Sequence, residues 1–190
     1  MFIYCLFCDR LKSEFLIRYF TDQYGCRVIS PIRIQHLRKK AENAKTAAER
    51  GKEETLDVER PLLPGYLFLY FEEPRDDAFR FRYVPGVIKC LSDTSGKYEL
   101  QGGDADFAMM IYEKNGIIGK TQVYQEGDRI RICEGAFKDV KAEILKVDRR
   151  TRRMQVAIPF ARQIVRTWLE YDIVKPENPP PEDLLTGQEE

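Results

Sequence analysis

The sequence predicts an α+β fold in two parts: a sandwich of helices on a small antiparallel sheet, then a small five-stranded β-barrel. In residues 1–114, short apolar segments alternate with segments whose apolar residues recur at helical spacing. In residues 125–177 only strand-like alternation follows, in roughly five short segments. Residues 115–124 contain two glycines and no periodicity, so we expect a flexible linker between two domains.

Composition indicates a folded protein with a charged surface. Hydrophobic residues make up 43% of the chain and charged residues 33%. Basic and acidic residues balance at 31 each, so only the local distribution of charge can indicate a nucleic-acid partner. The longest apolar run is too short to span a bilayer, and no secretion signal follows Met1. Five scattered cysteines are typical of buried free thiols in a reducing compartment, so we expect a cytoplasmic protein. We also expect a monomer.

The first elements are predicted from their ends. Phe2 to Cys8 is strand-like, and either Asp9 or Ser13 can cap the helix that follows. That helix should end at Gly25, because glycine adopts the left-handed conformation of a helix C-cap. Cys26 to Ile34 is then expected to be extended.

A polar block and an aromatic run follow. Composition leaves residues 36–60 open as a long hairpin, a surface helix or a disordered loop. Within PLLPGYLFLYFEEP (residues 61–74), Tyr66 to Phe71 has no polar break, which predicts a strand buried on both faces. A sharper interpretation is that its turn end, Leu62 to Tyr66, presents apolar side chains to a partner.

The remaining elements complete both domains. Asp76 to Tyr83 is expected to be a short helix, Val84 to Ile88 a turn into a strand, and Gly103 to Asn115 a helix. Residues 178–190 are rich in proline and acid, and we expect a disordered tail. The segments that predict the strands of the second domain are Arg129–Ile132, Ile144–Val147, Met154–Ile158, Gln163–Trp168 and Tyr171–Val174.

Several motifs resemble those of one family. The segment GDRIRICEGAF at residues 127–137, followed by residues 141–148, resembles the KOW motif of ribosomal proteins and of NusG transcription factors. IYCLFCDR, PLLPGYLFLYF and VPGVIKCL resemble the NusG N-terminal (NGN) domain, so the resemblance reaches nearly to Pro176. It implies an NGN sandwich joined to an SH3-like KOW barrel. Ile3, Leu62-Leu63 and Ala136 depart from the usual family residues toward specialised paralogues of the LoaP and RfaH kind.

The resemblance implies a transcription processivity or antitermination factor that suppresses pausing and termination. Its N-terminal domain would bind the clamp helices of RNA polymerase through Phe7, Leu63, Tyr66 and Phe68, an apolar patch of the type that anchors interfaces. Arg10 falls where family members can touch non-template DNA. An ordinary solvated arginine at a helix start explains that residue equally well.

A basic stretch lies in the KOW-like domain, around a turn that reads Asp-Arg-Arg-Thr-Arg-Arg. It predicts contact with RNA, in the manner of relatives that bind an RNA hairpin, although a solvated hairpin shows the same charge pattern. Other paralogues use this domain to contact a ribosomal protein. The candidate RNA-binding residues are Lys138, Lys141, Lys146, Arg149, Arg150, Arg152, Arg153, Arg162 and Arg166.

Enzymatic and metal-binding motifs are not visible. Cys5 and Cys8 are three apart on a strand, so their thiols should face opposite sides, and His36 is the only histidine. We therefore expect no metal, no cofactor and no catalysis. The alternatives to a polymerase-bound factor are a KOW-type RNA-binding or ribosome-associated protein without polymerase contact, and an enzyme whose site has no recognisable motif.

Overall fold

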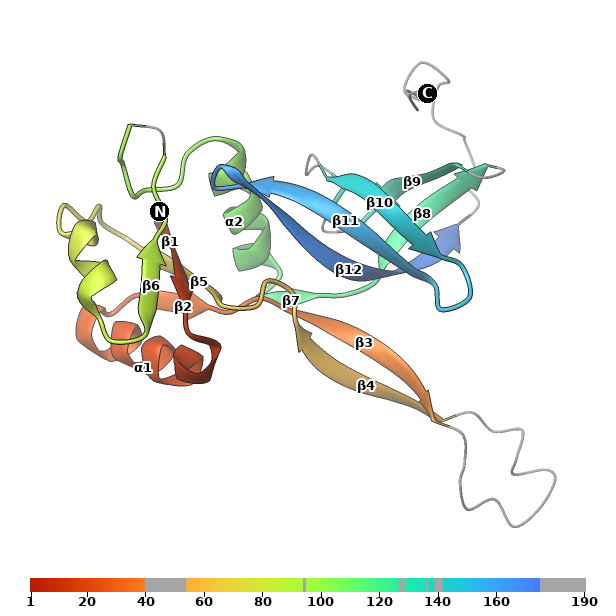
Figure 1. The fold of residues 1–190 in the computed structure, drawn as a ribbon, viewed down its shortest axis with the longest axis horizontal. Coiled ribbons are helices and arrows are strands. Elements are labelled where there is room, and N and C mark those ends of the chain that lie inside the picture. The colour runs from red at the N-terminus through yellow and green to blue at the C-terminus, as the bar shows by residue number, and fades with distance from the viewer. Residues whose placement is uncertain (40–53, 94, 127–128, 136, 139–141, 175–190) are drawn as a thin grey trace, which may run out of the picture.

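The computed structural model describes residues 1–39, 54–93, 95–126, 129–135, 137–138 and 142–174. Two bodies lie side by side, with α2 between them (Figure 1). The N-terminal body is built on a four-stranded antiparallel sheet in the order β2-β5-β1-β6. Its strands are β1 (Phe2–Cys8), β2 (Arg27–Ile29), β5 (Tyr66–Phe71) and β6 (Val87–Cys90).

The sequence predicted helices packed on this sheet, and the structure places them on both of its faces. Asp9 caps the first turn, because its carboxylate accepts a hydrogen bond from the Leu11 N–H at 3.0 Å. Gly25 ends the long helix at φ 64°, in the left-handed region. The helical elements are η1 (Arg10–Lys12), α1 (Ser13–Tyr24), η2 (Ala78–Tyr83) and α2 (Gly103–Glu113).

The strand β5 is buried along its whole length, which confirms the prediction from its unbroken apolar run. Leu67, Leu69 and Phe71 belong to a core cluster with residues of α1 and η2. Tyr66 and Phe68 belong to a second cluster, on the other face, which α2 and the C-terminal body complete. A strand with period-two alternation and two covered faces needs apolar residues at every position.

The turn before β5 requires glycine. Gly65 has φ +88°, and a Cβ there would lie 3.0 Å from the Cys8 carbonyl oxygen. The Gly65 carbonyl in turn accepts the Cys8 N–H at 2.7 Å, so this turn is fastened to the end of β1. The turn end of β5 and Phe7 are thereby held together.

The polar block is a hairpin where the structure describes it. β3 (Ile32–Lys39) pairs antiparallel with β4 (Glu54–Pro61), and β7 (Ile117–Ile118) completes a three-stranded sheet in the order β4-β3-β7. Figure 1 shows the hairpin projecting from the junction of the two bodies. This resolves the choice between hairpin, helix and loop for residues 36–39 and 54–60; residues 40–53 lie outside the described residues.

The C-terminal body is a five-stranded sheet in the order β10-β11-β12-β8-β9, curled into a half-barrel. Five strands were predicted, but two of the expected segments, 163–168 and 171–174, form one strand. The fifth strand comes from the expected linker. The strands are β8 (Thr121–Glu126), β9 (Arg129–Glu134), β10 (Glu143–Asp148), β11 (Arg153–Phe160) and β12 (Gln163–Val174).

Two details differ from the sequence-based expectation. Residues 117–118 and 121–126 are strands rather than structureless linker, because Ile118, Thr121 and Val123 are buried in the cores that they join. The sheet is not a closed barrel over the described residues, where β9 and β10 form its two edges. The parallel pairing of β8 with Tyr171–Val174 adds β8 between β12 and β9. The expected tail, 178–190, lies outside the described residues, and no helix among those described is long and apolar enough to cross a membrane.

Candidate functional site

The residues expected to contact polymerase lie together at one end of the N-terminal sheet. Phe7 pairs with Tyr66 across β1 and β5, and their ring centroids are 5.2 Å apart. Leu63 and Phe68 lie in the same cluster. We call Phe7, Leu63, Tyr66 and Phe68 the apolar face. Gly65 and the β1–β5 pairing position it.

The C-terminal sheet covers the apolar face. The ring centroid of Phe160, the last residue of β11, lies 6.1 Å from that of Tyr66 and 5.5 Å from that of Phe68. Phe107 of α2 extends the contact, at 5.4 Å from Phe160. The exposed fractions of Leu63, Tyr66 and Phe68 are 1%, 8% and 0%. In this arrangement the chain's own second domain covers the side chains that were expected to face a partner.

Hydrogen bonds at the β11–β12 turn and along β12 hold the two domains together. The Gln163 amide donates to the Tyr66 hydroxyl at 2.6 Å, and the Thr167 hydroxyl donates to the Leu62 carbonyl at 2.9 Å. The Ala161 N–H donates to Asp104 Oδ1, in the first turn of α2, at 3.0 Å. These bonds satisfy polar groups that docking removes from water.

Burial keeps the Tyr66 hydroxyl neutral. Desolvation, followed by the neighbouring Cys5 thiol, raises the pKa of Tyr66 above its ordinary value. At neutral pH the hydroxyl is therefore protonated, so its oxygen accepts the Gln163 proton while its O–H remains a donor.

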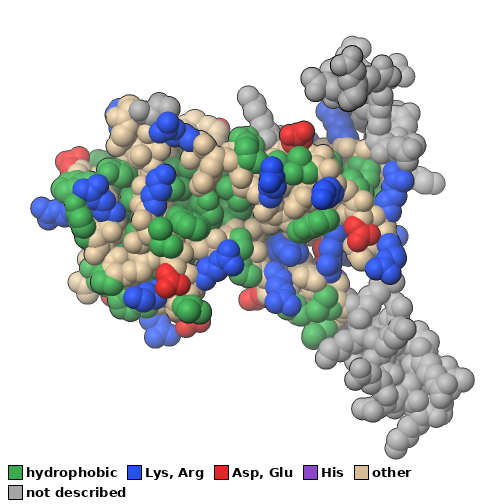
Figure 2. Space-filling model, in the orientation of Figure 1, with side chains coloured by type: hydrophobic (Ala, Val, Ile, Leu, Met, Phe, Trp, Pro, Cys, Tyr) green, Lys and Arg blue, Asp and Glu red, His purple; other side chains and the backbone are tan. Residues whose placement is uncertain are grey.

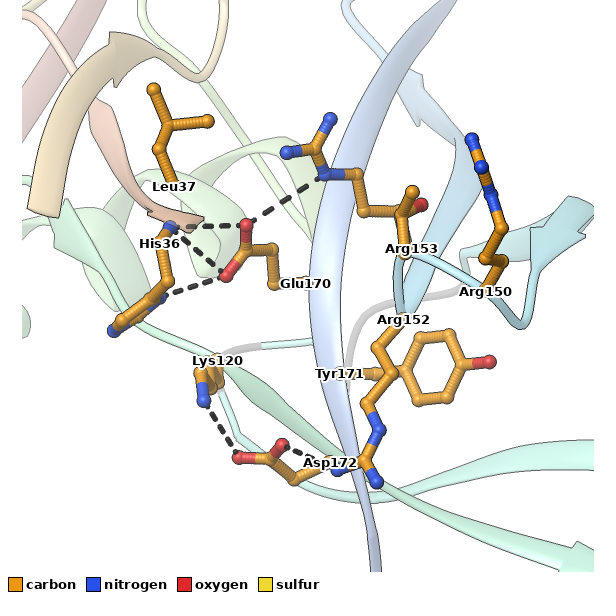
Figure 3. Close-up of a pocket in the computed structure, with 10 residues that line it drawn as sticks. His36, Leu37, Lys120, Arg150, Arg152, Arg153, Glu170, Tyr171 and Asp172 are labelled. Atoms are coloured by element: carbon orange, nitrogen blue, oxygen red, sulfur yellow. Dashed lines mark hydrogen bonds and ion pairs between the residues drawn. The ribbon is translucent and has the colours of Figure 1, made fainter. Parts of the chain in front are cut away.

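A second contact between the domains is built around Glu170 of β12 (Figure 3). Its carboxylate is 8% exposed and accepts two hydrogen bonds from His36 of β3, from the backbone N–H at 3.1 Å and from Nδ1 at 2.8 Å. Arg153 Nε lies 3.7 Å from the same carboxylate. Nearby, Asp172 pairs with Lys120 at 3.2 Å and with Arg152 at 3.7 Å.

These residues line a cavity of about 360 Å³ at the junction of the domains. The sequence predicted no role for His36, which stands in a polar block. Glu170, which accepts its Nδ1 hydrogen bond, lies 134 positions further along the chain, so no local pattern could have indicated this contact.

The candidate RNA-binding residues fall into groups. The β10–β11 turn brings Arg149, Arg150 and Arg152 together, and Arg153 begins β11. We call residues 149–153 the arginine turn. In Figure 2, basic side chains lie over both halves of the molecule, including the half that holds the C-terminal sheet. Lys138, Lys146 and Arg166 are exposed on the C-terminal domain, and Lys141 lies outside the described residues.

The structure separates Arg162 from the arginine turn. Arg162 lies in the β11–β12 turn, at the opposite end of the eight-residue strand β11. A strand of that length spans about 26 Å at roughly 3.3 Å per residue. Arg10, the candidate DNA contact, is exposed in η1 on the N-terminal domain. The predicted nucleic-acid residues therefore do not form one continuous cluster.

Asp148 shapes the arginine turn. Its Oδ1 accepts the backbone N–H groups of Arg150 at 3.0 Å and Thr151 at 3.1 Å. The hydrogen bond from the Thr151 side chain lowers the pKa of Asp148 most, and the bond from the Thr151 backbone N–H lowers it further. Its stabilising contribution is therefore present at neutral pH and is lost as the pH falls through that lowered pKa.

Four of the five cysteines are buried, Cys133 is half-buried, and the buried ones face different cores. Cys5 and Cys8 belong to clusters on opposite faces of the sheet, as their spacing predicted. Burial raises the pKa of Cys8 to about 12 and that of Cys5 well above its ordinary value, so both thiols are protonated at neutral pH. Among the residues that the structure describes, no group of three or more His, Cys, Asp and Glu could hold a metal ion.

Comparisons with known proteins point to one family, although no protein-family model matches the chain. It is 30% identical over 143 residues to the transcription termination/antitermination protein NusG of Treponema pallidum, which covers 70% of this chain and 74% of that protein. It is 25% identical over 122 residues to NusG of Pasteurella multocida, covering 63% and 67%.

A solved structure shares the fold. The structure described as "Domain interaction in Thermotoga maritima NusG" matches 89% of this chain and 93% of its own, with a TM-score of 0.50 at 18% sequence identity. The N-terminal sandwich and the curled C-terminal sheet both fall within that match.

Proposed function

Because the chain belongs to the NusG family of transcription termination/antitermination proteins, we propose that it binds RNA polymerase through its apolar face and promotes processive transcription. The observation that carries this proposal is the clustering of Phe7, Leu63, Tyr66 and Phe68 at one end of the sheet. Aromatic side chains in such a cluster are typical anchors of protein interfaces. The clamp helices of polymerase are the proposed partner.

Polymerase binding then requires the C-terminal sheet to leave the apolar face. The same side chains cannot contact Phe160 and polymerase at once, since they are already buried against Phe160. The affinity for polymerase should therefore be reduced by the fraction of molecules that are undocked. Each hydrogen bond across the interface contributes a net of about 0.5–1.5 kcal/mol to docking.

The arginine turn supports a second contact, with RNA. Asp148 orders the backbone at Arg150 and Thr151, so the turn presents its cationic groups from a defined loop. Guanidinium groups bind phosphates, and A-form RNA is recognised chiefly by phosphates and shape. We propose an RNA hairpin as the ligand of this turn and non-template DNA as the contact of Arg10.

Two variants test the polymerase contact. Gln163→Ala removes a docking hydrogen bond from the C-terminal side and leaves the apolar face intact. It should raise polymerase affinity by about two- to tenfold, since 1.4 kcal/mol corresponds to a factor of ten. Tyr66→Ala/Gln163→Ala loses the same hydrogen bond and also the aromatic anchor. It should bind polymerase at least about tenfold more weakly than Gln163→Ala, because burying an aromatic side chain is worth about 1.5–3 kcal/mol.

The measurement is a polymerase binding titration with full-length proteins whose folding has been checked by circular dichroism. Loss of the Tyr66 ring also weakens docking, and weaker docking raises the affinity for polymerase. A lower polymerase affinity of the double variant would therefore report loss of the polymerase contact itself. Equal affinities of the two variants, with equal undocking shown by amide exchange at Ala161, would contradict the proposal. They would favour the alternative of a KOW-type RNA-binding or ribosome-associated protein without polymerase contact.

A further inference from the structure

Docking of the two domains buries the proposed polymerase-binding surface and leaves the proposed RNA-binding surface exposed. Leu63, Tyr66 and Phe68 are at most 8% exposed beneath the C-terminal sheet. In the same docked molecule, Lys146 and Arg150 are exposed. One proposed ligand surface is closed, and the other is open.

The reason lies in the geometry of one hairpin. Phe160 and Gln163, which cover the apolar face, stand at the β11–β12 end of strand β11. Arg150 stands in the turn at the other end, about 26 Å away along an eight-residue strand. A ligand that binds Arg150 and Lys146 therefore need not touch the docking contacts at Phe160.

We infer that RNA binds the docked molecule, so that RNA capture precedes the uncovering of the polymerase-binding face and does not require it. The inference rests on the proposed function. A ligand shifts a conformational equilibrium only by its difference in affinity for the two states. Arg150 lines the junction cavity with His36, but both Arg150 and Lys146 are exposed in the docked molecule. RNA can therefore reach them without undocking, whereas polymerase binds only the undocked state.

This arrangement gives the proposed factor an order of events. A transcript that emerges from polymerase would hold the docked protein nearby and raise its effective concentration. Each spontaneous undocking then exposes the apolar face beside its target. Polymerase contact thus depends on RNA through proximity, without any conformational signal from RNA.

Two arginines of the predicted RNA set belong to the junction instead. Arg153 Nε faces Glu170, which binds His36 of the other domain, and Arg152 pairs with Asp172. Figure 3 shows both side chains with these carboxylates. A variant of either residue would change docking and RNA binding together, so the test leaves both intact.

The test compares RNA and polymerase affinities in docked and undocked molecules. Gln163→Ala/Thr167→Val removes two interface hydrogen bonds at the docking end, and faster amide exchange of Ala161, whose N–H is bonded to Asp104, verifies undocking. The RNA probe is a fluorescently labelled hairpin with a stem of about one helical turn. Its binding is measured by fluorescence anisotropy. We expect its Kd to stay within about twofold of the wild-type value while polymerase affinity rises several-fold.

A charge variant shows whether the probe uses the assigned surface. Arg150→Gln should weaken RNA binding and reduce the slope of log K against log salt by about one unit. Arg18→Gln is the matched control, because Arg18 is exposed on α1, outside the proposed surface, and the change in charge is the same. The control should leave both the affinity and the slope unchanged.

The possible failures are distinguishable. RNA affinity that rises with undocking in proportion to polymerase affinity would overturn the inference and leave the proposed RNA contact standing. Absence of RNA binding in both the docked and the undocked protein would overturn the inference and the RNA part of the proposed function together. Equal effects of Arg150→Gln and Arg18→Gln would show that the probe binds elsewhere, which also overturns the inference.

Discussion

Glu170 and Asp172 show how burial decides what one carboxylate contributes. Both lie on β12, two residues apart, and each has a cationic neighbour, Arg153 for Glu170 and Lys120 for Asp172. The Glu170 side chain is 8% exposed and accepts hydrogen bonds from the backbone and ring of His36. The Asp172 side chain is 43% exposed, where water and salt screen its ion pairs.

Glu170→Ala should lower the free energy of unfolding by about 1.5–3 kcal/mol, because hydrogen bonds to a charged group are lost and the half-buried donors of His36 lose this partner. Asp172→Ala should cost less than about 1 kcal/mol, as exposed ion pairs do. Urea denaturation of both variants measures the difference. Similar losses for the two would show that the contact between Glu170 and His36 does not hold the domains together.

The β11–β12 hairpin is the element on which docking depends, and its turn is strained. Ala161 and Arg162 have φ of 47° and 66°, in the left-handed region that costs residues with a Cβ about 1–2 kcal/mol each. Two consecutive left-handed residues form the turn that fits the twist of a two-stranded hairpin. The Ala161 N–H of this turn reaches Asp104 of α2, so the turn also serves as a docking contact.

Ala161→Asn/Arg162→Gly should therefore stabilise the protein by about 1–2 kcal/mol, because Asn-Gly adopts this turn with little strain. The backbone N–H that binds Asp104 is retained. Thermal unfolding measures the gain. Arg162→Ala is the control, since it removes the same charge and keeps the strain. A gain of equal size in the control would attribute the effect to charge instead of conformation.

At the scale of the whole molecule, the segment between the domains is part of both. Ile118 is buried beside β3, while Thr121 and Val123 are buried in the C-terminal sheet. Lys120, which lies between these contacts, pairs with Asp172 at 3.2 Å. Pairing of this kind protects a backbone from proteases, which need an extended and accessible segment.

Trypsin should therefore cut slowly after Lys120 in the wild-type protein. It should cut faster there in Gln163→Ala/Thr167→Val, whose domains separate more often. Mass spectrometry of the fragments that end at Lys120 or begin at Thr121 gives both rates, with cleavage after Arg18 as an internal reference. Rapid cleavage after Lys120 in the wild type would support the flexible linker that the sequence predicted.

Local patterns predicted several local elements correctly. The apolar run Tyr66–Phe71 indicated a strand covered on both faces, and Asp9 and Gly25 indicated the start and end of the first helical region. These predictions rest on interactions within a few residues, which adjacent side chains determine. The Asp-Arg-Arg-Thr-Arg-Arg segment indicated a basic turn for the same reason.

The sequence by itself thus determined most of the elements, the two-part α+β architecture and the resemblance to NusG proteins. Only the tertiary structure decided what covers each apolar surface. The unbroken apolar run indicates that Tyr66 and Phe68 avoid water, but it does not indicate whether Phe160, α2 or another protein covers them. The docked arrangement, the role of His36 and the place of β8 depend on contacts between distant segments. Hydrophobic burial is not directional, so a sequence pattern specifies that a side chain is buried and leaves the partner to the fold.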